Sequence, residues 1–364
     1  MSKRRKIIII VLLVLAVAGL GWLYRGYDWF KPGPNTPQTS QNQAPLEIVA
    51  QNLTVPWEIA WLPDGDMLVT ERPGTLKRIG ANQQTYTIEG VAHVGEGGLM
   101  GMTLHPKFGD NGWLYLYLTT GNGEGLINRV ERYRLEENQL ADRQLIIGNI
   151  PGARIHDGGR LAFGPDGLLY ITTGDAASPD SAQNTNSLAG KILRLTDDGR
   201  FPPDNPFGNA VYSYGHRNPQ GIAWDNRDQL WAVEHGSTAY DELNQINRGA
   251  NYGWPIVRGD QTQEGMVSPI VFSPDDGTWA PAGLAWWNAS LWFSGLRGQT
   301  LYQAKIGDNN QAELGAHYAE QFGRLRAVAV GPDGWLYFST SNTDGRGQPN
   351  AGDDKIIRIN SRQF

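Results

Sequence analysis

The chain has 364 residues, enough for one large domain or two ordinary ones, and only 19% of them are charged. Its net charge of −6 argues against a general nucleic-acid binder, and the absence of cysteine excludes disulfides, thiolate zinc sites and cysteine nucleophiles. The 46 glycines, 13 tryptophans and 14 tyrosines are typical of a β-rich fold with many tight turns.

Residues 1–30 predict export from the cytoplasm. Four cations at positions 3–6 precede an apolar run at 7–24, which is long enough to cross a bilayer as a helix. Small residues at 16–18 offer a cleavage site early in this run, so a cleaved signal peptide and a retained membrane anchor both stay open. Because positive charge stays on the cytoplasmic side, the rest of the chain is expected to be periplasmic or otherwise extracytoplasmic, and an anchor would tether it to the inner membrane.

Residues 31–45 are rich in Pro, Asn, Gln, Thr and Ser. Such a segment cannot bury much apolar surface, and it predicts a disordered linker. The folded domain is therefore expected to occupy residues 46–364.

One pattern recurs six times in this domain: an apolar strand, a turn, and a second apolar strand containing aromatic residues. The copies lie at 59–70, 101–118, 161–172, 222–233, 284–293 and 328–339, about 50 residues apart. Asp-Gly and Asn-Gly between apolar runs indicate hairpins, because such turns need positive φ. The spacing leaves room for about four strands per repeat, so the sequence predicts an all-β, six-bladed β-propeller. Residues 355–359 are expected to close the ring near the N-terminus. A β-sandwich with coincidental hairpins is the alternative.

Polar loops flank these hairpins, and in a propeller such loops meet at one mouth of the central channel. The loop at 154–160 contains His156, which can accept a proton near neutral pH, and glycines that let a ligand approach the backbone. Asp175 follows the third hairpin and is a candidate for orienting the imidazole. The alternative is a loop histidine bonded to the backbone.

Two more polar loops flank the fourth hairpin. In the loop at 215–221, Arg217 and Asn218 offer fork-like donors for a carboxylate or a pair of carbonyls. The loop at 234–242 contains acids and backbone carbonyls, which are the donors that a hard cation such as Ca²⁺ prefers. The alternatives are a structural turn for the first loop and solvated acids for the second.

Arginines mark the last two repeats. Arg297 lies in the fifth, and Arg324 and Arg326 precede the hairpin of the sixth. Strand alternation places Arg324 and Arg326 on one face, where they repel each other unless an anion or an acid lies between them. A ligand with several carboxylates would satisfy this pair, and so would acidic neighbours at the surface.

In this order on six hairpins, the four clusters resemble the soluble glucose and aldose sugar dehydrogenases that depend on pyrroloquinoline quinone (PQQ), a quinoprotein family. The likeness runs over residues 53–359 and is most specific at 215–221 and 234–255. It implies a six-bladed propeller that uses PQQ and Ca²⁺ to oxidise aldose sugars at the anomeric carbon to lactones. It also implies an artificial or respiratory electron acceptor as the partner.

The resemblance also implies residue roles. His156 matches the base that takes the proton from the anomeric hydroxyl while hydride moves to the quinone, and Asp175 matches its supporting acid. The implied cofactor-binding residues are Arg217, Asn218, Arg297, Arg324, Arg326 and Glu96. The implied calcium ligands are the carbonyls of Gly236 and Ser237 beside PQQ, and Glu242 and Tyr252 at a second, structural site.

Three positions depart from the family pattern. Ile155 stands where a polar residue often precedes the histidine, Glu96 replaces a glutamine, and Arg297 replaces a lysine. These differences bear on substrate preference more than on cofactor use. Two other functions stay open: a calcium-dependent lactonase-type hydrolase, which needs an acid-lined central metal site, and a non-catalytic binding propeller.

Overall fold

The computed structural model describes residues 38–39, 46–121, 125–137, 139–309 and 311–359. The predicted signal peptide or anchor at 1–30 lies outside the described residues, as does the linker at 31–45 apart from two residues. Within the described part of the chain, no helix is long and apolar enough to cross a membrane.

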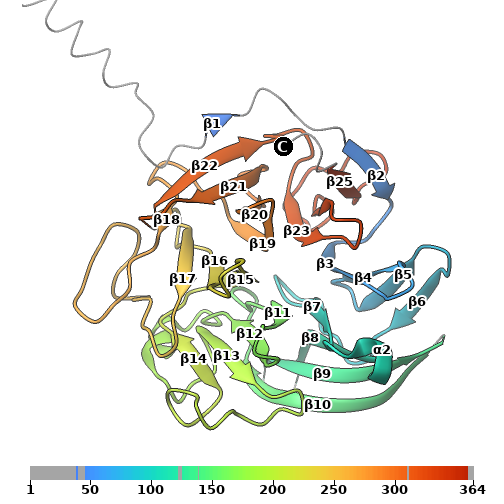
Figure 1. Ribbon diagram of the computed structural model, residues 1–364, viewed down its shortest axis with the longest axis horizontal. Coiled ribbons are helices and arrows are strands. Elements are labelled where there is room, and N and C mark those ends of the chain that lie inside the picture. Colours follow the sequence, from blue (N-terminus) through green and yellow to red (C-terminus); the bar gives the residue numbers. More distant parts are fainter. Residues whose placement is uncertain (1–37, 40–45, 122–124, 138, 310, 360–364) are drawn as a thin grey trace, which may run out of the picture. The chain divides into compact units, whose positions relative to one another are not determined.

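Six sheets surround a common axis, which confirms the predicted six-bladed β-propeller (Figure 1). The first blade is β3 (Pro56–Trp61), β4 (Met67–Glu71), β5 (Thr75–Ile79) and β6 (Gln84–Thr87). The second is β7 (Leu99–Leu104), β8 (Trp113–Gly121), β9 (Leu126–Glu136) and β10 (Gln139–Pro151). The third is β11 (Leu161–Phe163), β12 (Leu169–Thr173), β13 (Lys191–Leu195) and β14 (Val211–Tyr214).

The fourth blade is β15 (Pro219–Trp224), β16 (Leu230–Glu234), β17 (Glu242–Ile246) and β18 (Val271–Phe272). The fifth is β19 (Pro281–Trp287), β20 (Ser290–Gly295), β21 (Leu301–Ile306) and β22 (Ala312–His317), with the short β1 (Gln38–Thr39) parallel to β22. The sixth is β23 (Leu325–Val330), β24 (Leu336–Thr340), β25 (Ile356–Ile359) and β2 (Leu46–Ala50). The described helices are short: α2 (Phe108–Asn111) and the 3-10 helix η2 (Pro179–Gln183).

Each predicted hairpin forms the two innermost strands of one blade, from β3–β4 to β23–β24. The turns follow the expected backbone chemistry. Gly65, Gly167 and Gly334 have φ of 92°, 75° and 78°, and a Cβ added at any of them would meet no atom within 4 Å. These glycines are therefore needed for their positive φ and not for space.

The ring closes in the sixth blade. β2 pairs antiparallel with β25, with Leu46 opposite Ile359 and Ile48 opposite Ile357. This confirms the prediction that the last strand pairs near the N-terminus of the domain. The inner strand of this blade contacts those of the first and fifth blades, so the described inner strands form a continuous ring.

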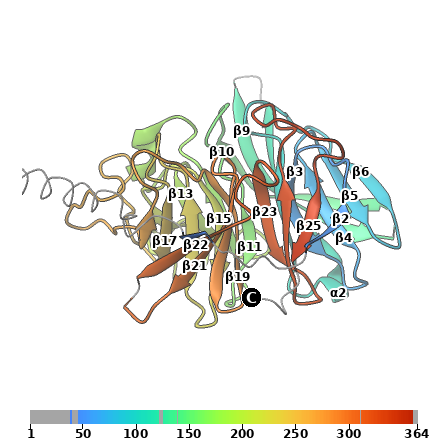
Figure 2. The same ribbon diagram turned by 90° about the horizontal axis from the view of Figure 1, so that it is seen from above.

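The apolar core lies between neighbouring blades. In one cluster, the buried Trp57 of the first blade packs with Tyr117 of the second and Ile171 of the third. Five of the six inner strands have a register shift close to their first residue, such as Pro56/Glu58 in β3 and Leu325/Val328 in β23. These bulges lie where the polar loops lead into the inner strands. Figure 2 shows the blades from the side, with connecting loops at both ends of the strands.

Candidate active site

A pocket opens at the end of the axis where the polar loops enter the inner strands. Its wall comes from loops of several blades and includes Glu96, Gln220, His235, Arg326, Asp344 and Arg346. The cavity therefore lies where the sequence predicted that the polar loops would meet.

A histidine–aspartate pair stands beside this cavity. The Nδ1 of His156 lies 2.7 Å from Oδ1 of Asp175, and the aspartate is completely buried. His156 has φ of 63°, a left-handed conformation that non-glycine residues rarely adopt. When Nδ1 carries the proton and donates it to the carboxylate, Nε2 keeps a lone pair that can accept a proton. The arrangement suits a general base.

The aspartate is held from two further sides. Trp254 donates its indole N–H to Oδ2 at 2.8 Å, and the backbone N–H of Ala177 donates to Oδ1 at 2.9 Å. Gly174 must lack a side chain, because its Cβ would lie 1.9 Å from the carbonyl oxygen of His156. These contacts fix the carboxylate that fixes the imidazole.

Glu96 links His156 to the opposite side of the cavity. Its Oε2 accepts the backbone N–H of His156 at 2.9 Å, and its Oε1 accepts Nη1 of Arg346 at 2.8 Å. Burial opposes ionisation of Glu96, but the His156 N–H bond and the charges of His235 and Arg346 together lower its pKa to about 2. The mouth of the cavity therefore holds a carboxylate and not a neutral acid.

Arg217 and Asn218 lie in the loop that leads from the third blade into the inner strand of the fourth. Arg217 donates its backbone N–H to Glu234 at 2.8 Å and Nη1 to the His235 carbonyl at 3.3 Å. Its buried Nε and the buried Nδ2 of Asn218 have no partner among the described residues. Burial lowers the pKa of the Arg217 guanidinium, although nearby acids oppose this. Unmatched buried donors favour a ligand rich in acceptors, since an unmade hydrogen bond costs about 1–3 kcal/mol.

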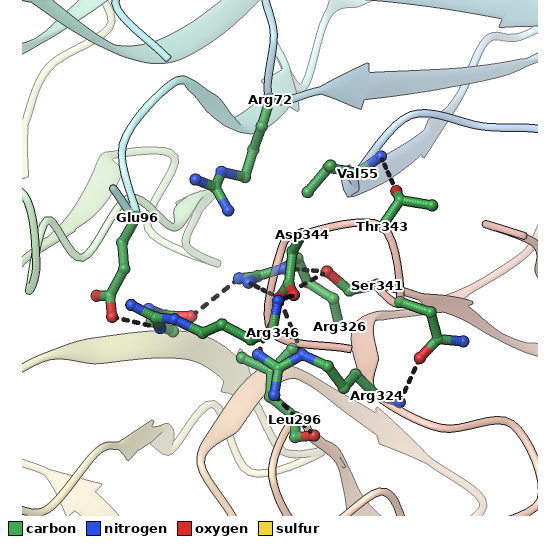
Figure 3. A network of polar contacts seen from close by, with 12 residues as sticks. Val55, Arg72, Glu96, Leu296, Arg324, Arg326, Ser341, Thr343, Asp344 and Arg346 are labelled. Carbon is green, nitrogen blue, oxygen red and sulfur yellow. Dashed lines mark hydrogen bonds and ion pairs between the residues drawn. The ribbon is translucent and has the colours of Figure 1, made fainter. Parts of the chain in front are cut away.

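Arg324 and Arg326 share an acid that the protein itself supplies (Figure 3). Arg324 donates Nε and Nη2 to Oδ2 of Asp344 at 2.9 and 2.8 Å, and Arg326 Nη2 lies 3.9 Å from the same oxygen. Arg326 also donates to Ser341 and Gln220. Burial, with the charge of Arg72, lowers the pKa of Arg326 to about 9. Of the two partners left open from the sequence, the structure contains the acidic neighbour.

Sequence reasoning missed Arg72, Asp344 and Arg346. Arg72 is buried, lines the cavity, and donates to the carbonyls of Gly95 and Gly97. All three residues come shortly after the second strand of a repeated hairpin, the same place as Asp175 and His235. That position in the repeat was the available signal.

Three predicted residues stand apart from this network: Arg297, Gly236 and Ser237. Arg297 is exposed, and the described residues form no ion pair with it. Gly236 donates its N–H to Asp241 at 2.9 Å and cannot bear a side chain, since its Cβ would lie 1.9 Å from the Ala239 carbonyl. Within the described chain, no hydrogen bond reaches the carbonyls of Gly236 or Ser237, which leaves both oxygens available.

Glu242 and Tyr252 line a second, small pocket. Glu242 accepts hydrogen bonds from Gly259 N–H and Asn244 Nδ2 at 3.2 and 3.0 Å. Burial, reinforced by Glu234, raises the pKa of Glu242 to about 8. The described residues contain no group of three or more His, Asp or Glu arranged for a metal ion. A cation here would therefore need carbonyl or water ligands as well.

Comparison with known proteins matches both the fold and most of the chain. The family model described as Glucose / Sorbosone dehydrogenase matches residues 53–357. The aldose sugar dehydrogenase of Escherichia coli is 31% identical over 340 residues, covering 82% of this chain and 91% of that protein. The PQQ-bound aldose sugar dehydrogenase of Streptomyces coelicolor has a TM-score of 0.81 and 40% identity, covering 87% and 98% of the two chains. A putative oxidoreductase (glucose dehydrogenase) of Thermus thermophilus has a TM-score of 0.83 and 42% identity, covering 87% and 100%.

Proposed function

The chain belongs to the glucose/sorbosone dehydrogenase family, and from this premise we propose that it is a PQQ-dependent aldose sugar dehydrogenase. The observation that carries the proposal is the His156–Asp175 pair beside a cavity flanked by the unpaired donors of Arg217 and Asn218. A proton acceptor and free donors in one place are what a sugar oxidation with an anionic quinone requires.

The side chains around the cavity fit PQQ. PQQ is a flat ortho-quinone with three carboxylates, so it needs donors for its carbonyl oxygens and cations for its acids. Arg217 and Asn218 would hold the quinone oxygens, while Arg326 and Arg72 place buried positive charge at the wall. Arg324 would contribute less, because Asp344 already neutralises it, and the exposed Arg297 would act at the mouth.

The chain's own contribution to the chemistry is proton removal and orientation. His156 Nε2 accepts the proton of the anomeric hydroxyl, and Asp175 stabilises the imidazolium that forms. PQQ, when bound, supplies the acceptor for the hydride of the same carbon, so the sugar becomes a lactone. Glu96 holds the backbone of His156 and presents its carboxylate to the sugar side of the cavity.

We also propose two calcium sites. Gly236 and Ser237 would offer their free carbonyls to a Ca²⁺ beside PQQ, where the ion acts as a Lewis acid. Glu242 and Tyr252 would bind a second, structural Ca²⁺. The raised pKa of Glu242, about 8, supports this assignment because a buried carboxylate gains from a cation.

We also propose that the protein is exported from the cytoplasm. This proposal rests on the sequence of residues 1–30 alone. Their basic start and apolar run support export to the periplasm, either through a signal peptide that is cleaved or with residues 7–24 retained as a tether to the inner membrane. The electron acceptor would then be a respiratory component, replaced by a dye in an assay.

Reconstitution tests the function. Purified apoprotein receives PQQ and Ca²⁺, and dye reduction is followed with a panel of aldoses. Sugar-dependent reduction that requires PQQ supports the proposal. Lactone hydrolysis with Ca²⁺ alone would point to the hydrolase instead, and inactivity in both assays would favour a binding propeller.

A further inference from the structure

Lys191 is a completely buried cation outside the network described above. It is the first residue of β13, opposite Thr173 of β12 in the third blade. No Asp or Glu among the described residues shifts the pKa of its ammonium, which burial alone lowers to about 7. A buried ammonium is expensive unless its donors are satisfied, so this position calls for an explanation.

Backbone carbonyls take the place of a carboxylate. The Nζ of Lys191 donates to the carbonyl oxygens of Ser181, Ala182 and Ala189 at 2.8, 3.0 and 2.5 Å. An ammonium has three N–H donors, and here each has an acceptor. All three acceptors belong to the loop at 174–190, which begins just before Asp175 and ends at the lysine. The ammonium thus joins the middle of this loop to its end.

Hydrogen bonds connect this loop to Asp175, which holds the imidazole of His156. Gln183, next to Ala182, donates to the Trp254 carbonyl at 2.6 Å and accepts from Asn251 at 2.8 Å. Trp254 in turn holds Asp175 through its indole N–H. The end of the loop is tied back by Gly190, whose N–H donates to the Gly174 carbonyl at 2.8 Å.

We propose that the Lys191 ammonium is an internal cation that organises the loop at 174–190 and thereby positions Asp175 and the base His156. Lys191 is a positioning residue, because it touches neither the cavity nor the imidazole. The inference rests on the proposed function for its kinetic part only, since loop order can be measured without any turnover.

Two variants distinguish the effect of the positive charge from the effect of the side-chain volume. Lys191→Met keeps a long side chain without the cation. Lys191→Ala leaves a space for n-propylammonium, which has the length and the N–H donors of the part of the side chain that is removed. All proteins are full length and reconstituted with PQQ and Ca²⁺, at about pH 6 where the ammonium predominates. Tetramethylammonium is the matched salt control, since it has the charge but no N–H donor.

For Lys191→Met we expect kcat to fall about 10–100-fold while the sugar KM changes less than about 3-fold, because orientation of the base is lost and sugar contacts are not. Hydrogen exchange of residues 176–190 should become faster. In Lys191→Ala, n-propylammonium should restore at least about 10-fold in kcat and slow the exchange again, and tetramethylammonium should do neither. A kcat for Lys191→Met within about 2-fold of the parent, or no rescue of folded Lys191→Ala, would overturn the proposal.

Should both lysine variants fail to fold, Gln183→Leu tests the same chain of contacts at a residue that is only half-buried. It removes the link from the loop to Trp254 and should lower kcat by about 10-fold, whereas an unchanged kcat counts against the proposal. If the parent protein oxidises no aldose, the proposed function fails by itself. The exchange and rescue measurements on residues 176–190 then still decide the role of Lys191.

Discussion

The two sides of the cavity differ in whether their buried donors and cations already have partners. The base side, which we define as His156, Asp175, Arg217 and Asn218, holds its imidazole and carboxylate firmly, but two of its buried donors have no acceptor among the described residues. The arginine side, made of Arg324, Arg326, Asp344 and Arg346, contains more positive charge, yet its acids are already paired with it. If the proposed function holds, we therefore expect the strongest ligand contacts at the unsatisfied donors and not where cations are most numerous. Unsatisfied donors are the better guide.

The largest effect is expected from His156→Ala on the base side. Loss of the general base should lower kcat by about 10²–10⁴-fold, while PQQ still binds. Dye reduction gives kcat, and titration of the PQQ absorption gives the affinity. His105→Gln, at the far end of β7, is the control and should stay within about 2-fold of the parent. Equal rates for His156→Ala and the parent would remove the base from the mechanism.

Asp175→Asn should come next. The amide cannot hold the imidazole in the same tautomer, so kcat should fall by about 10–100-fold with little change in PQQ affinity. The same two measurements apply. A larger loss of PQQ binding than of kcat would mean that Asp175 serves the cofactor and not the base.

The pair Arg217→Ala and Arg324→Ala compares the two sides directly. Arg217→Ala should weaken PQQ binding by about 10-fold or more, because its free donor has no substitute. Arg324→Ala should change PQQ affinity less, but it leaves Asp344 short of its partner and should lower the free energy of unfolding by about 1–3 kcal/mol. Fluorescence titration and urea unfolding measure the two effects. The reverse order of PQQ affinities would break the comparison.

Glu96→Gln, which changes the bridge between the sides, should have the smallest effect on turnover, within about 10-fold, since an amide oxygen can still accept the His156 N–H.

The contribution of Glu96 to the free energy of unfolding should depend on pH. The pKa of Glu96 falls from 4.5 to about 2 on folding, so its carboxylate stabilises the fold above pH 4.5 and this contribution is lost as the pH falls towards 2. The difference in unfolding free energy between parent and variant should therefore shrink by about 1–3 kcal/mol from pH 7 to pH 3. A difference independent of pH would contradict an ionised Glu96.

The fold could be predicted because its signals are local. A turn such as the one at Gly167 needs positive φ whatever surrounds it, and six such turns between apolar strands are enough to count blades. The location of His156 and Asp175 near each other also followed from the repeat, since both flank the third hairpin.

The partners of the site residues could not be predicted in the same way. Trp254 reaches Asp175 from 79 positions away, and Asp344 reaches Arg324 from 20 positions away. Nothing in the sequence distinguishes an acid that neutralises an arginine pair from an acid in water. The departure at Glu96 was visible, but its pairing with Arg346 across 250 positions depends on closure of the ring.

The pairing of β2 with β25 has a consequence for biosynthesis. β2 is made first but can gain its partner only after Ile359 has left the ribosome, so its edge stays open while nearly the whole domain is translated. The first five blades can form in order during this time, whereas the sixth cannot. The nascent chain should therefore be most vulnerable to aggregation and most dependent on chaperones at this one edge, and a stop codon before β25 would leave it permanently unpaired.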